Sequence, residues 1–144
     1  MTQSWEFKKS FYVAIGREFA WEFLVDMQNV AKIEKVTIEL DGPFQSGTKG
    51  RTITPDSRQE WEIIDVVPLE CFTILGRESE FEMRFTWELK EEGRGTRMIQ
   101  TIHACGPEAE MSKWEGVLRE METNVPKSHE NMVAELTRRA NASK

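Results

Sequence analysis

Several kinds of functional site are excluded by what the sequence lacks. Only two cysteines are present, Cys71 and Cys105, and they lie far apart without a CxxC spacing. They indicate reduced structural thiols, because disulfide frameworks and zinc sites need more cysteines at closer spacing. Only two histidines occur, and the chain contains no HExxH, GxSxG, P-loop or GxGxxG motif. These absences argue against hydrolases, kinases and Rossmann enzymes, and we expect no metal and no cofactor.

The chain also lacks an excess of basic charge and any long hydrophobic run. Its formal net charge is −6, which argues against nucleic-acid binding, since contacts with the phosphate backbone depend on basic groups. No stretch has the apolar length needed to cross a bilayer, so we expect no stable membrane insertion. Residues 1–10 carry charges without a following apolar run, which predicts the absence of a secretory signal and a cytoplasmic location.

The composition is that of a globular domain. The chain has 144 residues, of which 39% are hydrophobic and 31% are charged. This length is typical of one domain and is sufficient to bury a core, or to enclose a cavity, without disulfides or metal. We therefore expect a single domain over residues 1–144, present as a monomer or a homodimer.

Two short helices are predicted after a first strand. Apolar residues alternate with polar ones over residues 5–15, and this period of two marks a half-buried strand. Over residues 19–27 the apolar residues recur at helical spacing. Asn29 is the predicted N-cap of a second helix, which ends near Lys35.

The middle of the chain has the pattern of an antiparallel meander. Short segments rich in β-branched and aromatic residues are separated by glycine and proline turns, which predicts six strands. They cover residues 36–40, 48–54, 59–67, 71–75, 81–90 and 96–105. The clearest alternation lies in residues 81–90, where apolar side chains occupy the odd positions. One face of that strand is therefore expected to be buried and the other exposed to solvent.

Helical spacing returns after Pro107. An apolar stripe from Trp114 to Ala140 keeps its phase through Pro126. Because a proline usually kinks a well-packed helix without abolishing it, the pattern predicts one long bent helix over residues 108–141. Two helices with a break at residues 124–126 are the alternative.

The order of these elements resembles the helix-grip fold. Local marks of the resemblance are FAWEFLVD at residues 19–26, GPFQSGT at 42–48, the strand end at 66–68, WEL at 87–89 and GTR at 95–97. Together they resemble the SRPBCC superfamily, which is START-like and Bet v 1-like, and within it the polyketide cyclase/dehydrase-like branch. The chain departs from that branch after Asp26, where many relatives have a tryptophan and a proline. The resemblance implies an α+β fold in which a curved seven-stranded antiparallel sheet wraps around a long C-terminal helix.

An internal pocket is the expected binding site, because a strongly bent sheet crossed by a helix leaves space that its own side chains do not fill. Polar residues that face inward are the most informative, since burying them without a partner costs free energy. Gln100 and His129 are predicted to face inward, as is Lys9, whose ammonium is expected to reach out at the rim. The predicted ligand-binding residues are Trp61, Ile63, Phe81, Met83, Phe85, Trp87, Met98, Gln100, Trp114, Leu118, Met121, Val125 and His129.

Binding or carriage of a hydrophobic small molecule, such as a lipid, an isoprenoid or an aromatic or polyketide-like metabolite, is the leading hypothesis. The alternative is a cyclase or dehydratase with His129 as general acid or base and Gln100 or Lys9 as orienting donors. No catalytic residue is assigned, and the sole tyrosine, Tyr12, is predicted to point away from the pocket. A protein-interaction module would instead expose a large apolar patch. Burial is expected to lower the pKa of His129, because it disfavours the imidazolium.

Overall fold

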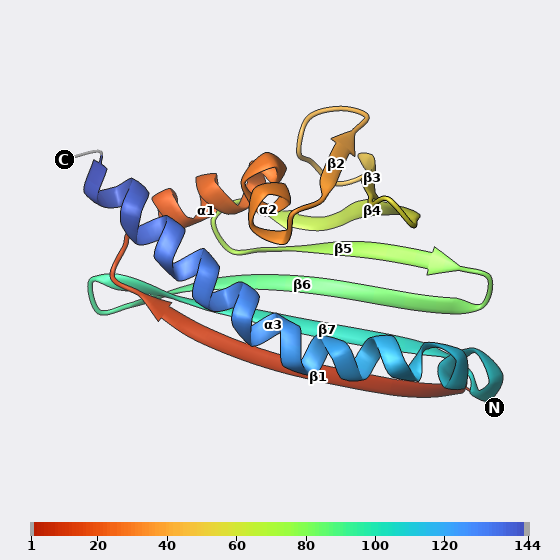
Figure 1. The fold of residues 1–144 in the computed structure, drawn as a ribbon. Helices are drawn as coiled ribbons and strands as arrows, with labels where there is room; N and C mark the ends of the chain where they lie inside the picture. The colour runs from red at the N-terminus through yellow and green to blue at the C-terminus, as the bar shows by residue number, and fades with distance from the viewer. Residues whose placement is uncertain (1, 143–144) are drawn as a thin grey trace.

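One antiparallel sheet and one long helix make up most of the fold (Figure 1). The computed structural model describes residues 2–142. The strands lie side by side in the order β1-β7-β6-β5-β4-β3-β2. This arrangement confirms the predicted α+β helix-grip architecture. The elements are β1 (Thr2–Val13), α1 (Arg17–Val25), α2 (Met27–Glu34), β2 (Thr37–Leu40), β3 (Lys49–Ile53), β4 (Arg58–Val67), β5 (Cys71–Glu78), β6 (Phe81–Glu92), β7 (Gly95–Pro107) and α3 (Glu108–Ala142).

One face of the sheet carries the apolar side chains and is crossed by α3, and we call it the concave face. In β6, Phe81 and Trp87 on this face are buried, whereas Lys90 on the opposite, convex face is exposed. Residues paired across neighbouring strands lie on the same face of the sheet. Gln100 of β7 pairs with Trp87 and with Lys9 of β1, so both Gln100 and Lys9 lie on the concave face. Figure 1 shows α3 crossing this face over β1 and β7, with α1 and α2 beyond its C-terminal half.

Helix α3 continues through Pro126 as a single helix, as the apolar stripe predicted. Leu118 is buried before the proline, and Met132 and Leu136 are buried after it. Packing on both sides of Pro126 offsets the loss of one backbone hydrogen bond at the proline. The alternative of two helices broken at residues 124–126 is therefore wrong.

The boundary between α1 and α2 differs from the predicted one. Helix α2 begins at Met27, and its N-cap is Asp26, whose carboxylate accepts a hydrogen bond from the backbone N–H of Gln28 at 3.2 Å. The predicted N-cap, Asn29, lies inside the helix, where its buried amide donates to the carbonyl oxygen of Phe23 at 2.9 Å. Aspartate and asparagine cap helices about equally well. Tertiary packing makes Asp26 the N-cap here. The side chain of Asn29 is instead used in a hydrogen bond to a carbonyl oxygen at the end of α1.

The end of α2 provides a test of the helix capping. Lys35 follows the helix in the left-handed conformation, with φ at 59°, and its backbone N–H donates to the carbonyl of Ala31. Glycine adopts this conformation freely, whereas a side chain there costs on the order of 1 kcal/mol. We therefore expect Lys35→Gly to raise the free energy of unfolding by about 1 kcal/mol, as measured by urea denaturation.

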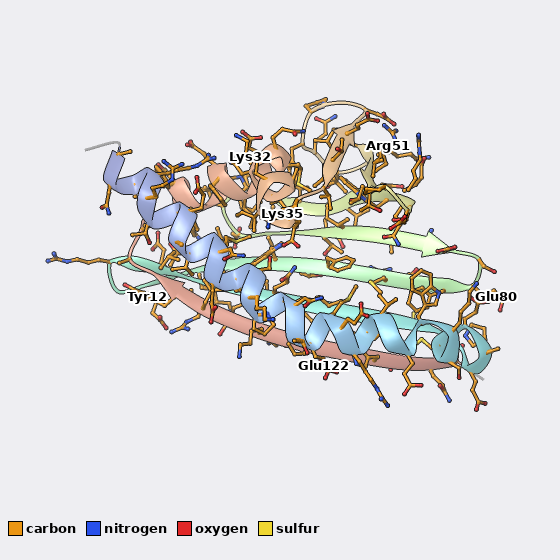
Figure 2. The ribbon with its side chains drawn as sticks, viewed as in Figure 1. Tyr12, Lys32, Lys35, Arg51, Glu80 and Glu122 are labelled. Carbon is orange, nitrogen blue, oxygen red and sulfur yellow. The ribbon has the colours of Figure 1, made fainter. Side chains whose placement is uncertain are left out.

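Lys32 of α2 (Figure 2) gives a matched control for this substitution. It lies within the helix, so Lys32→Gly should lower the free energy of unfolding by about 1 kcal/mol, because glycine weakens helix interiors. If Lys35→Gly destabilises the protein as much as Lys32→Gly does, the left-handed cap at Lys35 is wrong.

Candidate functional site

Two apolar clusters lie between α3 and the sheet. The first packs on the C-terminal half of α3, and we call it the C-terminal cluster; its members include Trp87, Leu89, Met98, Met132 and Leu136. The second packs on the N-terminal half of α3, and we call it the N-terminal cluster. It is built from Phe81, Met83, Ile102, Ala104, Met111 and Leu118, with Trp5, Phe7, Phe85, Trp114, Met121 and Val125 packed against them.

Three polar residues lie where the two clusters meet. On β7, Gln100 stands between Met98 of the C-terminal cluster and Ile102 of the N-terminal cluster. Lys9 of β1 pairs with Gln100 in the sheet register. His129 of α3 is hydrogen bonded to the side chain of Gln100. We call Lys9, Gln100 and His129 the polar row, and it unites the three inward polar positions that the sequence indicated.

His129 is held as a neutral imidazole. The residue is only 4% exposed, and its Nε2 lies 2.7 Å from Oε1 of Gln100. Because a carbonyl oxygen only accepts, Nε2 carries the proton and donates it. Burial, followed by the positive charge of Lys9, lowers the pKa of His129 from 6.5 to about 4, which is the predicted direction. At neutral pH, Nδ1 therefore carries a lone pair, and this buried atom has no hydrogen-bond partner among residues 2–142.

Aromatic rings surround the imidazole. The ring centroids of Phe11 and Trp87 lie 4.8 Å and 5.4 Å from that of His129. These rings keep water away from the imidazole, which favours its neutral form. Phe11 was not among the predicted ligand-binding residues. The alternation of β1 could have identified it, because Phe11 lies two positions after Lys9 on the same face.

Many of the predicted ligand-binding residues meet in the N-terminal cluster. Phe81 stacks on Trp114 with the ring centroids 4.8 Å apart and an angle of 5° between the planes. Phe85, Met121 and Val125 are half-buried, so the sheet and the helix leave part of their apolar surface uncovered. The predicted residues gathered here are Phe81, Met83, Phe85, Trp114, Leu118, Met121 and Val125.

The two predicted residues of β4 are placed differently. Trp61 belongs to a third cluster under α2 and β2. Its indole Nε1 donates to Oγ1 of Thr52 at 2.9 Å, and its ring lies so close to Gly50 that a Cβ there would overlap it. Ile63 is fully buried opposite Ile74 of β5. Trp61 is therefore held by β3 and not by α3.

Two open hollows flank α3. One lies between the β1–α1 connection and the end of α3, and it is lined in part by Ile15 and Phe19. The other lies between the start of β1 and the first half of α3, and it is lined in part by Trp5 and Leu118. Leu118 lines the second hollow, and no other predicted ligand-binding residue lines the first or the second. Enclosure of the concave face into an internal cavity therefore stays a prediction.

The convex face carries a cluster of paired charged groups, Arg77, Glu82 and Arg84. Hydrogen bonds from Arg84 and Arg77 lower the pKa of Glu82, so this carboxyl is ionised and paired on the face where the sequence placed it. Tyr12 is 41% exposed and also lies on this face, as predicted. Within residues 2–142, no three His, Cys, Asp or Glu side chains are grouped as a metal would require. No helix in that range has the length and apolar character of a membrane span.

Comparison with solved structures identifies the fold. A Staphylococcus aureus protein of unknown function superposes with a TM-score of 0.77 at 12% identity, over 97% of this chain and 98% of the other. Norcoclaurine synthase from Thalictrum flavum, in complex with dopamine and hydroxybenzaldehyde, superposes with a TM-score of 0.73 at 11% identity. The match covers 94% of this chain and 87% of the synthase chain. Ara h 8.0201 superposes with a TM-score of 0.69 at 12% identity, over 94% of this chain and 99% of the other. No protein-family model and no curated protein matches the sequence.

The chain therefore shares its fold with these solved structures, and this is the helix-grip fold that the order of its elements predicted. Identities of 11–12% show a shared fold and carry no ligand or activity with them.

Proposed function

We propose that the protein binds a small, largely apolar molecule on the concave face, against the polar row and the N-terminal cluster. The observation that carries the proposal is the set of half-buried apolar side chains that α3 and the sheet leave partly uncovered, above all Phe85, Met121 and Val125. Apolar area of this kind, beside a few fixed polar groups, is typical of small-molecule sites. A norcoclaurine synthase with this fold holds dopamine and hydroxybenzaldehyde, which supports a ligand of similar size.

A neutral fluorescent dye provides the test. N-phenyl-1-naphthylamine fluoresces strongly only in apolar surroundings, and we expect it to bind the folded protein. Phe85→Ala removes a half-buried ring from the concave face and should weaken dye binding about tenfold, because a lost aromatic contact costs on the order of 1.4 kcal/mol. A fluorescence titration measures the dissociation constant, and circular dichroism confirms that the variant is folded.

Leu75→Ala is the matched control for Phe85→Ala. Leu75 is also half-buried but pairs with Arg84 on the convex face of the neighbouring strand. Its loss should leave dye binding unchanged. A dye that does not bind, or that loses the same affinity in both variants, would remove the basis for a site on the concave face.

A cyclase or dehydratase of the polyketide cyclase/dehydrase-like kind is the second candidate. The observation that favours it is the neutral imidazole of His129, whose Nδ1 has no hydrogen-bond partner within the described part of the chain, as a general base requires. Because Nδ1 is closed off from solvent, the surrounding rings must move before a substrate could reach it. Binding without turnover is therefore the first choice.

Proton exchange separates the two candidates. A base at His129 should accelerate the exchange of deuterium into the methyl group of 2-acetylnaphthalene, and His129→Phe should abolish this acceleration. Mass spectrometry follows the exchange. If wild-type protein binds the ketone and leaves its exchange rate unchanged, the enzyme candidate is wrong and binding alone remains.

A further inference from the structure

The polar row contains a cation on the concave face that has no carboxylate partner among the residues that the structure describes. Lys9 stands between Phe7 and Phe11 on the inward side of β1, with its side chain exposed. No carboxylate of residues 2–142 forms an ion pair with it. Arg77 and Arg84, in contrast, both pair with Glu82 on the convex face. An unpaired ammonium beside apolar rings is placed to attract an anion from outside the chain.

Gln100 places hydrogen-bond donors beside that cation. Its Oε1 accepts from Nε2 of His129, which fixes the orientation of the side-chain amide. The two N–H groups of the same amide have no partner among residues 2–142, and Gln100 is only half-buried. His129 therefore acts as a positioning residue, since it turns the amide so that the donors face away from the imidazole and remain available.

We propose that Lys9 and Gln100 bind the acidic head of the ligand, so that the ligand is an apolar molecule with a single anionic group, such as a carboxylate. This inference rests on the proposed binding site and specifies its ligand class. The ammonium of Lys9 supplies the charge, and the amide of Gln100 supplies N–H donors to an acid oxygen. The apolar body then lies along the half-buried side chains of the N-terminal cluster, which meets the polar row at Ile102.

Two dyes with the same aromatic frame test the acid specificity. 1-Anilinonaphthalene-8-sulfonate carries one sulfonate, and N-phenyl-1-naphthylamine is its neutral counterpart. Lys9→Met should weaken binding of the sulfonate about tenfold, because a charge-assisted contact is lost. Binding of the neutral dye should stay unchanged. Lys8→Met is the matched control, because Lys8 pairs with Thr101 on the convex face of the same strand, and it should affect neither dye.

Gln100→Glu provides a second variant that keeps the acceptor for Nε2 of His129 and removes the amide donors. Its negative charge should weaken sulfonate binding at least about tenfold and leave neutral-dye binding within about twofold. Displacement of the sulfonate dye by dodecanoic acid or by 1-naphthoic acid then distinguishes an aliphatic acid from an aromatic one.

The outcomes separate this inference from the proposed function. If neither dye binds the wild-type protein, the binding site itself is wrong. If both dyes bind but Lys9→Met and Gln100→Glu weaken the two dyes equally, or weaken neither, the acid-head inference is overturned and the apolar site stands. Selective loss of the sulfonate dye in both variants, with unchanged binding in Lys8→Met, supports the inference.

Discussion

Lowering the pH from 7 to 5 is expected to reduce the free energy of unfolding by about 2 kcal/mol through His129 alone. The folded-state pKa of this residue is about 4, against 6.5 for an unperturbed histidine. Between pH 4 and pH 6.5, the folded protein therefore binds fewer protons than the unfolded chain. The stabilisation is fully present above pH 6.5 and is lost as the pH falls towards 4. Protonation favours the unfolded chain, because the buried site disfavours the imidazolium.

Urea denaturation at the two pH values measures this effect. The lower value is kept at 5 because the pKa values of Glu82 and Glu135 are lowered, and these carboxyls add their own pH dependence below their ordinary range. His129→Phe should remove most of the loss, whereas His103→Asn, a change to the other histidine, should retain it. If His129→Phe loses as much stability as the wild type over this interval, then His129 is not the buried neutral group described above.

Gly95→Ala is expected to be the most destabilising single substitution considered, with a loss of more than about 3 kcal/mol. Gly95 begins β7, and a Cβ added there would overlap the carbonyl oxygen of Val13 and the ring of Tyr12. The backbone oxygen belongs to a paired strand and has no room to move. Since β1 and β7 carry two members of the polar row, the clash would also disturb the candidate site.

Gly76→Ala is the control for that loss, because Gly76 also lies in a strand but is not crowded. A Cβ there would approach the carbonyl oxygen of Glu60 at 3.8 Å, which is an ordinary contact. Its effect on the free energy of unfolding should stay within about 0.5 kcal/mol. Thermal or urea denaturation of both variants decides the matter. A Gly95→Ala protein as stable as Gly76→Ala would show that β1 and β7 do not approach as closely as described.

The elements of the fold were predictable because buried residues recur in the sequence with the period of a strand or a helix. Alternation over residues 81–90 identified β6, and the stripe through Pro126 identified α3 as one helix. The same periodicities placed Gln100 and His129 on inward faces, and both lie there. A residue's own face can be read from its neighbours, since the faces of strands and helices repeat at fixed intervals.

Contacts between distant elements were not predictable in the same way. The hydrogen bond between His129 and Gln100 joins residues 29 positions apart, and no local pattern indicates which side chain meets which. The choice of Asp26 over Asn29 as the N-cap of α2 likewise depended on the carbonyl of Phe23 at the end of α1. Trp61 is inward by alternation, yet its hydrogen bond to Thr52 holds it under α2. Alternation gives the face of a side chain and not its partner.

A nuclear magnetic resonance titration tests the binding site on the concave face most directly. In a nitrogen-15 correlation spectrum, added N-phenyl-1-naphthylamine should shift the backbone signals of Phe85, Met121 and Val125, which lie on or against the concave face. 1-Anilinonaphthalene-8-sulfonate should in addition shift the side-chain amide signals of Gln100. Signals of the convex residues Leu75 and Arg84 should not move. Shifts confined to the convex face, or a spectrum unchanged at saturating dye, would contradict a ligand site between α3 and the sheet.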